Sequence, residues 1–483
     1  MFILSIDQGT TGTKSVLYDR DGQIFDLAHR EFTQIYPKPG WVEHDPLEIW
    51  QTVVDTVEEL LSRSHGEIAA IGITNQRETT VIWDKKSGKP IYNAIVWQCR
   101  RTTGYCEELN DRQALFRSKT GLPVDAYFSG TKIKWILENV KKYNIDDLLF
   151  GTIDTWLIWK LTQGNVHATD YTNASRTMLF NIREKKWDDE LCSLLNVPKA
   201  ILPEVKKSID NYGTVKSISR LKGIPIYGIA GDQQAALFGQ TCFENGEIKN
   251  TYGTGCFVMM NTGNEYVASE KGLITTIAVD GCGEPCYALE GSIFIAGAAI
   301  QWLRDELQLI EKASDSEKAA NSVKDCNGVY LVPAFVGLGA PHWDMNARGV
   351  LVGLTRGTSR NHVIRAALES MAYQTYDVLT TMERETGIKV KKLAVDGGAT
   401  VNNFLMQFQA DIINKPVVRP SLIESTSLGV AFMAGLKAGI WKDYEELCSL
   451  KKCDREFIPS MDNKDRGKLL KGWQKALRQA MVE

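Results

Sequence analysis

The 483-residue sequence lacks the features that mark several large classes of protein. Its first six residues reach Asp7 without a basic segment, so we expect neither a signal peptide nor a membrane span at this start. It has no dense basic run, and 56 Lys and Arg against 59 Asp and Glu leave a formal net charge of -3. We therefore expect a cytoplasmic protein that neither inserts into membranes nor binds nucleic acid.

Cysteine gives no sign of a metal site or a disulfide framework. The ten cysteines are scattered, and the close pairs are Cys282 with Cys286 and Cys448 with Cys453. Neither pair has a matching second pair or a nearby histidine that would complete a zinc site. We expect reduced thiols in a cytosolic protein.

The composition is that of an ordinary soluble globular protein, with 43% hydrophobic and 24% charged residues. At roughly 150 residues per domain, the length suits two to four domains. Apolar runs at Phe2–Ile6 and Lys14–Tyr18 flank a turn rich in glycine and threonine, which predicts a β-hairpin, and a third strand is expected over 23–32. A helix should begin at Pro46, with Asp45 as its cap and Glu48 completing a capping box.

The second half of the chain repeats this arrangement of two strands around a turn rich in glycine and threonine. Lys249–Met260 is another strand, turn and strand with glycine and threonine at its tip. A turn signal at Asn245–Gly246 separates the two copies. We therefore expect a compact α/β protein with two similar domains, 1–246 and 247–483, and a cleft between them.

The first turn, Asp7 to Thr13, has the residues of a phosphate-binding loop. Its glycines let backbone N–H groups approach an anion, and its threonine hydroxyls and Lys14 add donors. Asp7 would repel a phosphate unless it faced a cation, so a Mg²⁺ ion is the natural partner. The motif is not a Walker A loop, and an ordinary hairpin turn is the alternative.

Two further junctions of strand and helix carry candidate chemistry. Val395–Ala399, followed by Asn402, could hold the phosphates or ribose of a nucleotide, or could be a tight connection that needs glycine for packing. Asp232 stands where a strand ends and a helix begins. Its carboxylate could cap the helix or act as a general base on a substrate hydroxyl, as phosphoryl transfer requires.

Seven blocks follow one another along essentially the whole chain: Ile6–Thr11, Gly72–Glu78, Tyr127–Trp135, Asp170–Arg176, Gly231–Gln234, Asn250–Cys256 and Asp396–Ala399. With these blocks the sequence resembles the FGGY family of carbohydrate kinases, and its glycerol-phosphorylating branch in particular. Tyr127–Asn139 and Gly349–Glu369 also fit the two signature patterns of the family.

The resemblance implies a fold of the actin, Hsp70 and hexokinase type, with two ribonuclease-H-like domains around a cleft. It implies transfer of phosphate from ATP with Mg²⁺ to glycerol, with Asp232 as the catalytic base and Asp7 facing the metal. The residues that would line the glycerol pocket are Arg77, Glu78, Trp97, Tyr127, Asp232, Gln233 and Phe257. The residues that would hold the nucleotide are Thr10, Thr11, Gly12, Lys14, Thr254, Gly297, Gln301, Gly398 and Asn402.

The chain departs from the family pattern at a few positions. Many relatives carry serine at position 12 and arginine at position 14, where this chain has Gly12 and Lys14. Ser217–Gly223 lacks the glycine-rich loop that binds fructose 1,6-bisphosphate in some relatives, and no histidine lies between His167 and His342 for regulatory phosphorylation. We expect neither form of control, and family resemblance suggests a homodimer or homotetramer.

Two other functions fit parts of the sequence. A kinase of the same family could act on another polyol or sugar, although Arg77, Glu78 and Trp97 favour glycerol. A protein of a different class, an ATP-driven switch like actin or Hsp70, would share the phosphate hairpins but not the polyol-binding residues. Comparing turnover on several polyols, and ADP formation with and without glycerol, separates these functions.

Overall fold

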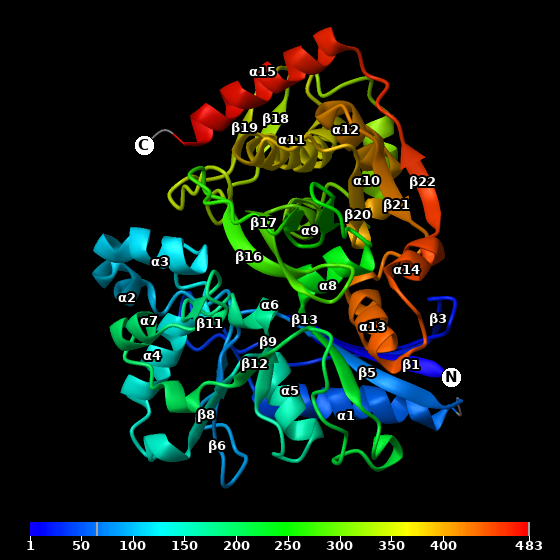
Figure 1. Cartoon of the computed structure of the whole chain (residues 1–483). Coiled ribbons are helices and arrows are strands. Elements are labelled where there is room, and N and C mark those ends of the chain that lie inside the picture. Colours follow the sequence, from blue (N-terminus) through cyan, green and yellow to red (C-terminus); the bar gives the residue numbers. More distant parts are fainter. Residues whose placement is uncertain (64–65, 482–483) are drawn as a thin grey trace.

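The computed structural model describes residues 1–63 and 66–481, which form two α/β halves shown one above the other in Figure 1. The first sheet has the order β13-β5-β1-β2-β3 and the second the order β16-β17-β15-β14-β20-β21-β22. The first sheet contains β1 (Phe2–Gln8), β2 (Gly12–Tyr18), β3 (Ile24–Glu31), β5 (Ile68–Asn75) and β13 (Ile226–Gly231). The second contains β14 (Ile248–Tyr252), β15 (Cys256–Gly263), β16 (Ile274–Val279), β17 (Pro285–Ile293), β20 (Leu393–Asp396), β21 (Val417–Pro420) and β22 (Cys453–Phe457).

The remaining elements surround these sheets. The α-helices are α1 (Pro46–Ser62), α2 (Thr103–Glu108), α3 (Gln113–Thr120), α4 (Ser129–Asn139), α5 (Ile153–Leu161), α6 (Tyr171–Ala174), α7 (Asp189–Leu194), α8 (Asp232–Gly239), α9 (Gly297–Asp305), α10 (Asp315–Asn321), α11 (Arg360–Thr386), α12 (Asn403–Ile413), α13 (Ser425–Ala438), α14 (Tyr444–Leu450) and α15 (Asn463–Ala480). The short paired strands are β4 (Glu43–His44) with β7 (Ala94–Ile95), β6 (Val81–Asp84) with β8 (Leu148–Gly151), β9 (Ala168–Asp170) with β12 (Glu204–Lys206), β10 (Phe180–Asn181) with β11 (Lys186–Trp187), and β18 (Tyr330–Val332) with β19 (Val350–Val352). Across the described residues, none of the helices combines the length and apolar character that a membrane crossing requires.

The two sheets share one topology. In the first, β1, β2 and β3 form an antiparallel meander, while β5 and β13 run parallel beside β1. In the second, β14, β15 and β17 form the meander, and β20 and β21 run parallel beside β14. Strands β16 and β22 extend its two edges. The expected internal repeat therefore extends beyond the two hairpins to all five strands of the first sheet and the central five strands of the second.

Each half has its own apolar core. Helix α1 buries Ile49, Val53 and Val57 against the first sheet, and Asp45 caps the helix by accepting a hydrogen bond from the N–H of Leu47 at 2.8 Å. The expected capping box is wrong in one detail. The Glu48 carboxylate accepts instead from the backbone N–H and the hydroxyl of Thr33, both at 2.9 Å.

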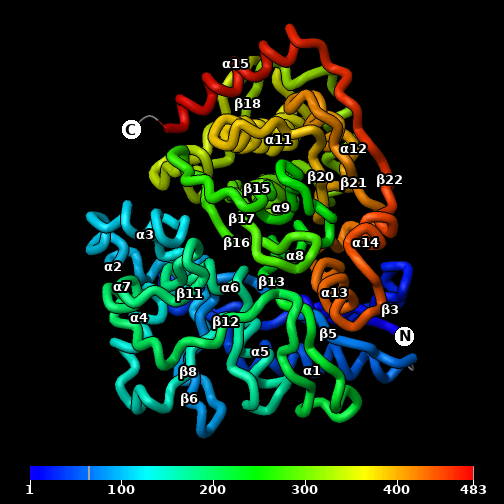
Figure 2. The backbone as a smooth tube through the Cα atoms, in the orientation of Figure 1, coloured from blue at the N-terminus to red at the C-terminus, as the bar shows by residue number. Residues whose placement is uncertain are grey.

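Helix α13 comes from the second half of the sequence but packs on the first sheet beside α8, as Figures 1 and 2 show. Glycines make this close approach possible. A Cβ atom on Gly429 of α13 would lie 1.9 Å from the carbonyl oxygen of Ala235, and one on Gly72 of β5 would lie 2.2 Å from that of Val430. The two halves are thus joined through direct contact of backbones, and the domain boundary at residue 246 stays a prediction.

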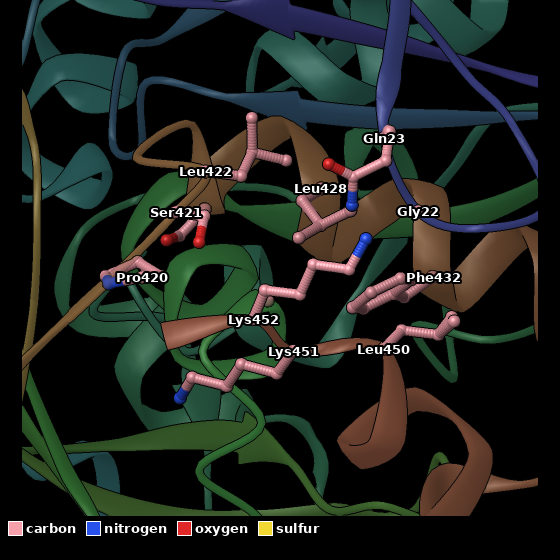
Figure 3. Close-up of a pocket in the computed structure, with 12 residues that line it drawn as sticks. Gly22, Gln23, Pro420, Ser421, Leu422, Leu428, Phe432, Leu450, Lys451 and Lys452 are labelled. Atoms are coloured by element: carbon pink, nitrogen blue, oxygen red, sulfur yellow. The ribbon is translucent and has the colours of Figure 1, made fainter. Parts of the chain in front are cut away.

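A second contact between the halves encloses a cavity of about 20 Å³. Figure 3 shows Lys452 extending toward Gln23 and Leu428 across this space. A volume of this size admits a water molecule but no nucleotide or sugar. The substrate site therefore lies elsewhere. The lining residues are Gly22, Gln23, Gly239, Pro420, Ser421, Leu422, Ser425, Leu428, Phe432, Leu450, Lys451 and Lys452.

We predict that Gly429→Ala lowers the free energy of unfolding by about 2 kcal/mol, because the added methyl group forces α13 away from α8. Thermal and denaturant unfolding followed by circular dichroism measures the change. Gly467→Ala is the matched control, since Gly467 also lies within a helix and its added Cβ would have no described atom within 4 Å apart from its chain neighbours and the nearby backbone of its own helix. Equal losses of stability in the two variants would contradict the prediction.

Candidate active site

The residues expected at the substrate site gather where β5 and β13 end and the second sheet faces them. Arg77 and Glu78 follow β5, and Asp232 begins α8 directly after β13. Parallel strands present their carboxyl ends at the same edge of a sheet, which brings these side chains together. Glu290, from β17 of the second sheet, meets them there.

A buried cluster of opposite charges forms at this point. Nη1 of Arg77 lies 2.5 Å from Oε2 of Glu290, and its Nη2 lies 3.2 Å from Oε1 of the same carboxylate. Arg176 donates from Nη2 to Glu290 at 3.0 Å and from Nε to Glu78 at 2.5 Å. Charges this deeply buried are tolerated only when they are paired. Each member of the cluster therefore depends on the others.

Glu78 has a strained backbone. Its φ of 60° lies in the left-handed region, which a residue with a side chain rarely adopts and which often marks a functional site. Its carbonyl oxygen accepts hydrogen bonds from the Ser129 hydroxyl at 3.0 Å and from Nζ of Lys132 at 3.2 Å. Burial lowers the pKa of Lys132 to about 7. These donors hold Glu78 in its unusual conformation.

Asp232 is the first residue of α8 and not its N-cap, which is Gly231. Its Oδ1 accepts a hydrogen bond from the N–H of Gln233 at 2.7 Å and lies 3.1 Å from Nε of Arg77. The side chain is 30% exposed. Burial raises the pKa of Asp232, and Arg77 opposes this rise. Both contacts use Oδ1, which leaves acceptor positions of the carboxylate for a substrate hydroxyl.

Two aromatic rings stand beside this cluster. The ring centroids of Trp97 and Tyr127 are 5.4 Å apart in an edge-to-face arrangement. The indole N–H of Trp97 donates to the Thr10 hydroxyl at 3.0 Å, which joins the aromatic wall to the first glycine-bearing turn. The Arg176 guanidinium lies 5.7 Å from the centroid of the Tyr127 ring. The expected wall residues are thus brought next to the charged cluster.

Lys249, at the start of the second hairpin, crosses to the first half. Its Nζ donates to Oε1 of Gln233, to the Thr251 hydroxyl at 2.8 Å and to the carbonyl of Phe257 at 3.3 Å. Three acceptors match the three donors of an ammonium group, whereas a neutral amine has only two. Burial lowers the pKa of Lys249 to about 8. Its charged form therefore ties two expected pocket residues, Gln233 and Phe257, together.

Asp7 lies at the end of β1 close to the cluster. Burial raises the pKa of Asp7 to about 7; Lys14 opposes this rise, and Glu424 and Asp232 add to it. Lys14 pairs with Glu424 at 2.6 Å, a contact between the two halves of the chain that we did not expect. No group of three metal-ligating side chains occurs within residues 1–63 and 66–481. A Mg²⁺ ion usually takes one or two carboxylates with water and phosphate, so Asp7 fits that ion.

The residues expected to hold the nucleotide fall into two groups. The turn between β1 and β2 carries Thr10 and Thr11, Gly12 begins β2, and Lys14 follows in the same strand. The turn between β14 and β15, helix α9 and the segment before α12 carry Thr254, Gly297, Gln301, Gly398 and Asn402. In the second group the N–H of Gly297 donates to the Gly253 carbonyl at 3.1 Å, and Asn402 caps α12. No hydrogen bond among the described residues joins the groups directly.

Position 12 shows why glycine suits this chain. A Cβ atom on Gly12 would lie 2.6 Å from Nε2 of His29 and 2.8 Å from the carbonyl oxygen of Arg30. The neighbouring strand β3 therefore fills the space that a serine side chain would need. Only the backbone N–H of this residue is free to serve as a phosphate donor.

Four buried charged residues at the site were missed by the sequence analysis: Lys132, Arg176, Lys249 and Glu290. Three of them lie within or next to motifs that we had recognised, but residue type and spacing did not assign them a role. Glu290 carried a signal of its own. It is a single carboxylate inside the apolar strand β17, and a lone charge in a buried strand needs a partner.

Comparison with known proteins now defines the class. Residues 2–239 match the N-terminal domain of the FGGY family of carbohydrate kinases, and residues 248–438 match its C-terminal domain. The chain belongs to the FGGY family of carbohydrate kinases. The expected fold class, with two actin- and hexokinase-like α/β domains, is confirmed.

Within this family the chain is similar to glycerol kinases. It is 61% identical to glycerol kinase from Carboxydothermus hydrogenoformans, covering 99% of this chain and 98% of that protein. Identity to glycerol kinase from Clostridium botulinum is 59%, with the same coverage. The crystal structure of Plasmodium falciparum glycerol kinase with ADP is 40% identical, has a TM-score of 0.94, and covers 100% of this chain and 98% of that chain.

We predict that kcat/KM of the unaltered protein falls above about pH 8 and that this fall moves to higher pH in Lys249→Arg. Loss of the Lys249 proton above its pKa of about 8 leaves one of its three acceptors without a donor, whereas an arginine stays charged. A pH–rate profile checks this. Lys134→Arg, outside the site, should keep the original profile. An unchanged alkaline limb in Lys249→Arg would contradict the prediction.

Proposed function

We propose that the chain transfers the γ-phosphoryl group of ATP to glycerol and releases sn-glycerol 3-phosphate and ADP. The observation that carries the proposal is the 61% identity, over almost the whole chain, to a protein named glycerol kinase. The ADP in the Plasmodium falciparum structure supports the choice of nucleotide. The reaction provides for glycerol uptake and catabolism and supplies a precursor for lipids.

The charged cluster suits a small triol. Hydroxyl groups need donors and acceptors, and a site that bonds each of them rejects analogues that lack one. Arg77 supplies donors, Glu78 and Asp232 supply acceptors, and Trp97 with Tyr127 can cover the carbon atoms. In our proposal the full pocket comprises Arg77, Glu78, Trp97, Tyr127, Asp232, Gln233 and Phe257.

Asp232 is the proposed general base. The terminal hydroxyl oxygen of glycerol attacks the γ-phosphorus of ATP, and the bond from that phosphorus to the bridging oxygen of ADP breaks. The hydroxyl proton moves to the Asp232 carboxylate. Burial raises the pKa of this carboxyl group, which makes it a better proton acceptor than an exposed aspartate.

The nucleotide is proposed to bind across both hairpin turns, with its phosphates at Thr10, Thr11, Gly12 and Lys14. The nucleoside end of the nucleotide would contact Thr254, Gly297, Gln301, Gly398 and Asn402. Mg²⁺, when bound at Asp7, supplies charge neutralisation for the phosphates. Approach of the two halves excludes water that would otherwise hydrolyse ATP. A cytoplasmic location and a homodimer or homotetramer complete the proposal.

We predict that Asp232→Asn lowers kcat by about 100-fold to 10,000-fold, the usual contribution of a general base. Binding of glycerol and of ATP should persist, because the amide keeps an acceptor oxygen. A coupled assay of ADP formation measures turnover, and calorimetry measures binding. Asp411→Asn is the matched control, since this buried aspartate lies in the second half, where its carboxylate accepts a hydrogen bond from the backbone N–H of Ser460. Near-normal turnover of Asp232→Asn would rule out its assignment.

We predict that kcat/KM for glycerol exceeds that for erythritol and for xylulose by about 100-fold or more, because the polar groups of the site are matched to three hydroxyls. Parallel assays with the three substrates test this. A higher value for a longer polyol or a sugar would favour another kinase of the family. ATP turnover that does not respond to any of them would favour an ATP-driven switch protein.

A further inference from the structure

We infer that Glu290 is a positioning residue for phosphoryl transfer, which the second half of the chain contributes to hold Arg77 and Arg176 at the substrate site. The inference rests on the proposed function and adds a residue to it. Glu290 lies in β17, opposite Met259 of β15 and Ile274 of β16, within a strand whose other residues are mostly apolar. Its side chain is fully buried.

The geometry at Arg77 shows what Glu290 does. The carboxylate of Glu290 receives both terminal nitrogens of the Arg77 guanidinium, at 2.5 and 3.2 Å. Such a paired contact fixes the plane of the guanidinium, because its donors form a rigid fork. The third nitrogen, Nε, then lies 3.1 Å from Oδ1 of Asp232. Glu290 thus sets the position of the cation that faces the proposed base.

Glu290 also holds Arg176. This guanidinium spans two carboxylates, with Nη2 on Glu290 and Nε on Glu78. Its Nη1 is buried and has no hydrogen-bond partner among the described residues. Buried donors are nearly always satisfied, so a free donor beside Glu78 and Tyr127 is a position for a substrate oxygen or a water molecule. Loss of Glu290 would release one of the two anchors that aim this arginine.

Charge balance gives Glu290 a second effect. Two guanidinium groups, those of Arg77 and Arg176, are paired with two carboxyl groups, those of Glu78 and Glu290. Burial opposes the ionisation of Glu290, but Arg176 and Arg77 outweigh burial and lower its pKa to about 2. It is therefore charged whenever the enzyme works. Without that charge, the surplus positive charge would lower the pKa of Asp232 and make it a weaker base.

The contact joins the two halves of the chain. Arg77 and Arg176 follow elements of the first half, whereas Glu290 lies in the second sheet. The cluster is therefore complete only while the second sheet lies against the end of β5. The arrangement of the substrate site depends in this way on contact between the two halves.

Glu290→Gln tests the inference. We expect kcat/KM for glycerol to fall about 100-fold, because Arg77 and Arg176 lose the carboxylate that positions them, and small misplacements at a reacting site cost about that much. KM for glycerol should rise more than KM for ATP, and the acidic limb of the kcat/KM profile should move to lower pH. Glu290→Asp retains the charge, so its acidic limb should stay in place and part of the lost kcat/KM should return.

Glu369→Gln is the matched control, because Glu369 is another buried glutamate of the second half, paired with Arg365 at 2.8 Å. It should keep the kinetics of the unaltered protein. Thermal unfolding and ADP binding show whether each variant folds. If Glu290→Gln does not fold, Glu290→Asp decides: a raised KM for glycerol with an unmoved acidic limb supports the inference, and an unaltered KM overturns it.

The outcomes separate this inference from the proposed function. Absence of glycerol-dependent ADP formation by the unaltered protein would overturn the proposed function and the inference with it. Normal activity of the unaltered protein, together with an unchanged KM and acidic limb in Glu290→Gln, would overturn the inference alone.

Discussion

The pairing of charges in a dry environment is the constraint on which this structure depends. Two arginines and two glutamates are buried where the first sheet meets the second, and a single unpaired member would be strongly destabilising. The cluster can form only if β5 of the first half ends against β17 of the second. The requirement for paired charges thus dictates how the two sheets face each other and keeps a polar site within the apolar interior.

The sequence predicted the parts of the fold that depend on local chemistry. Residues adjacent in sequence determine the glycine-bearing hairpins, the Asp45 cap and the strand-to-helix junction at Asp232. The structure has all of these features. The capping box at Glu48 failed because Thr33, distant in sequence, competes for the same carboxylate. A pattern of neighbouring residues does not predict that a residue outside the pattern will bind the same carboxylate.

The candidate site was predicted only in part, and for the same reason. Family motifs indicated Asp232 and its neighbours, which the structure brings together. Glu290 and Lys249 escaped notice because both arginine partners of Glu290, and Gln233 among the partners of Lys249, lie in the other half of the chain. Their importance follows from tertiary pairing, and a single sequence does not contain the pairing. A charge inside an apolar strand is the one local sign that a distant partner exists.

The two buried lysines at the site, Lys132 and Lys249, have different structural roles. Nζ of Lys249 has three acceptors and a pKa of about 8, whereas Nζ of Lys132 has two acceptors, both backbone carbonyls, and a pKa of about 7. The number of acceptors matches the proton count that each group can keep. Lys249 therefore works as a cation between the halves, and Lys132 can hold the backbone beneath Glu78 even when it is neutral.

The position of helix α13 has a practical consequence. Although it comes late in the chain, it covers β5 and β13 of the first sheet through the contacts at Gly72 and Gly429. A fragment that stops at residue 246 would leave that face of the first sheet open to solvent. The remaining fragment would contain α13 without the sheet on which it packs. Expression of the two sequence halves as separate proteins would thus produce two incomplete folding units, each without a surface that the other supplies.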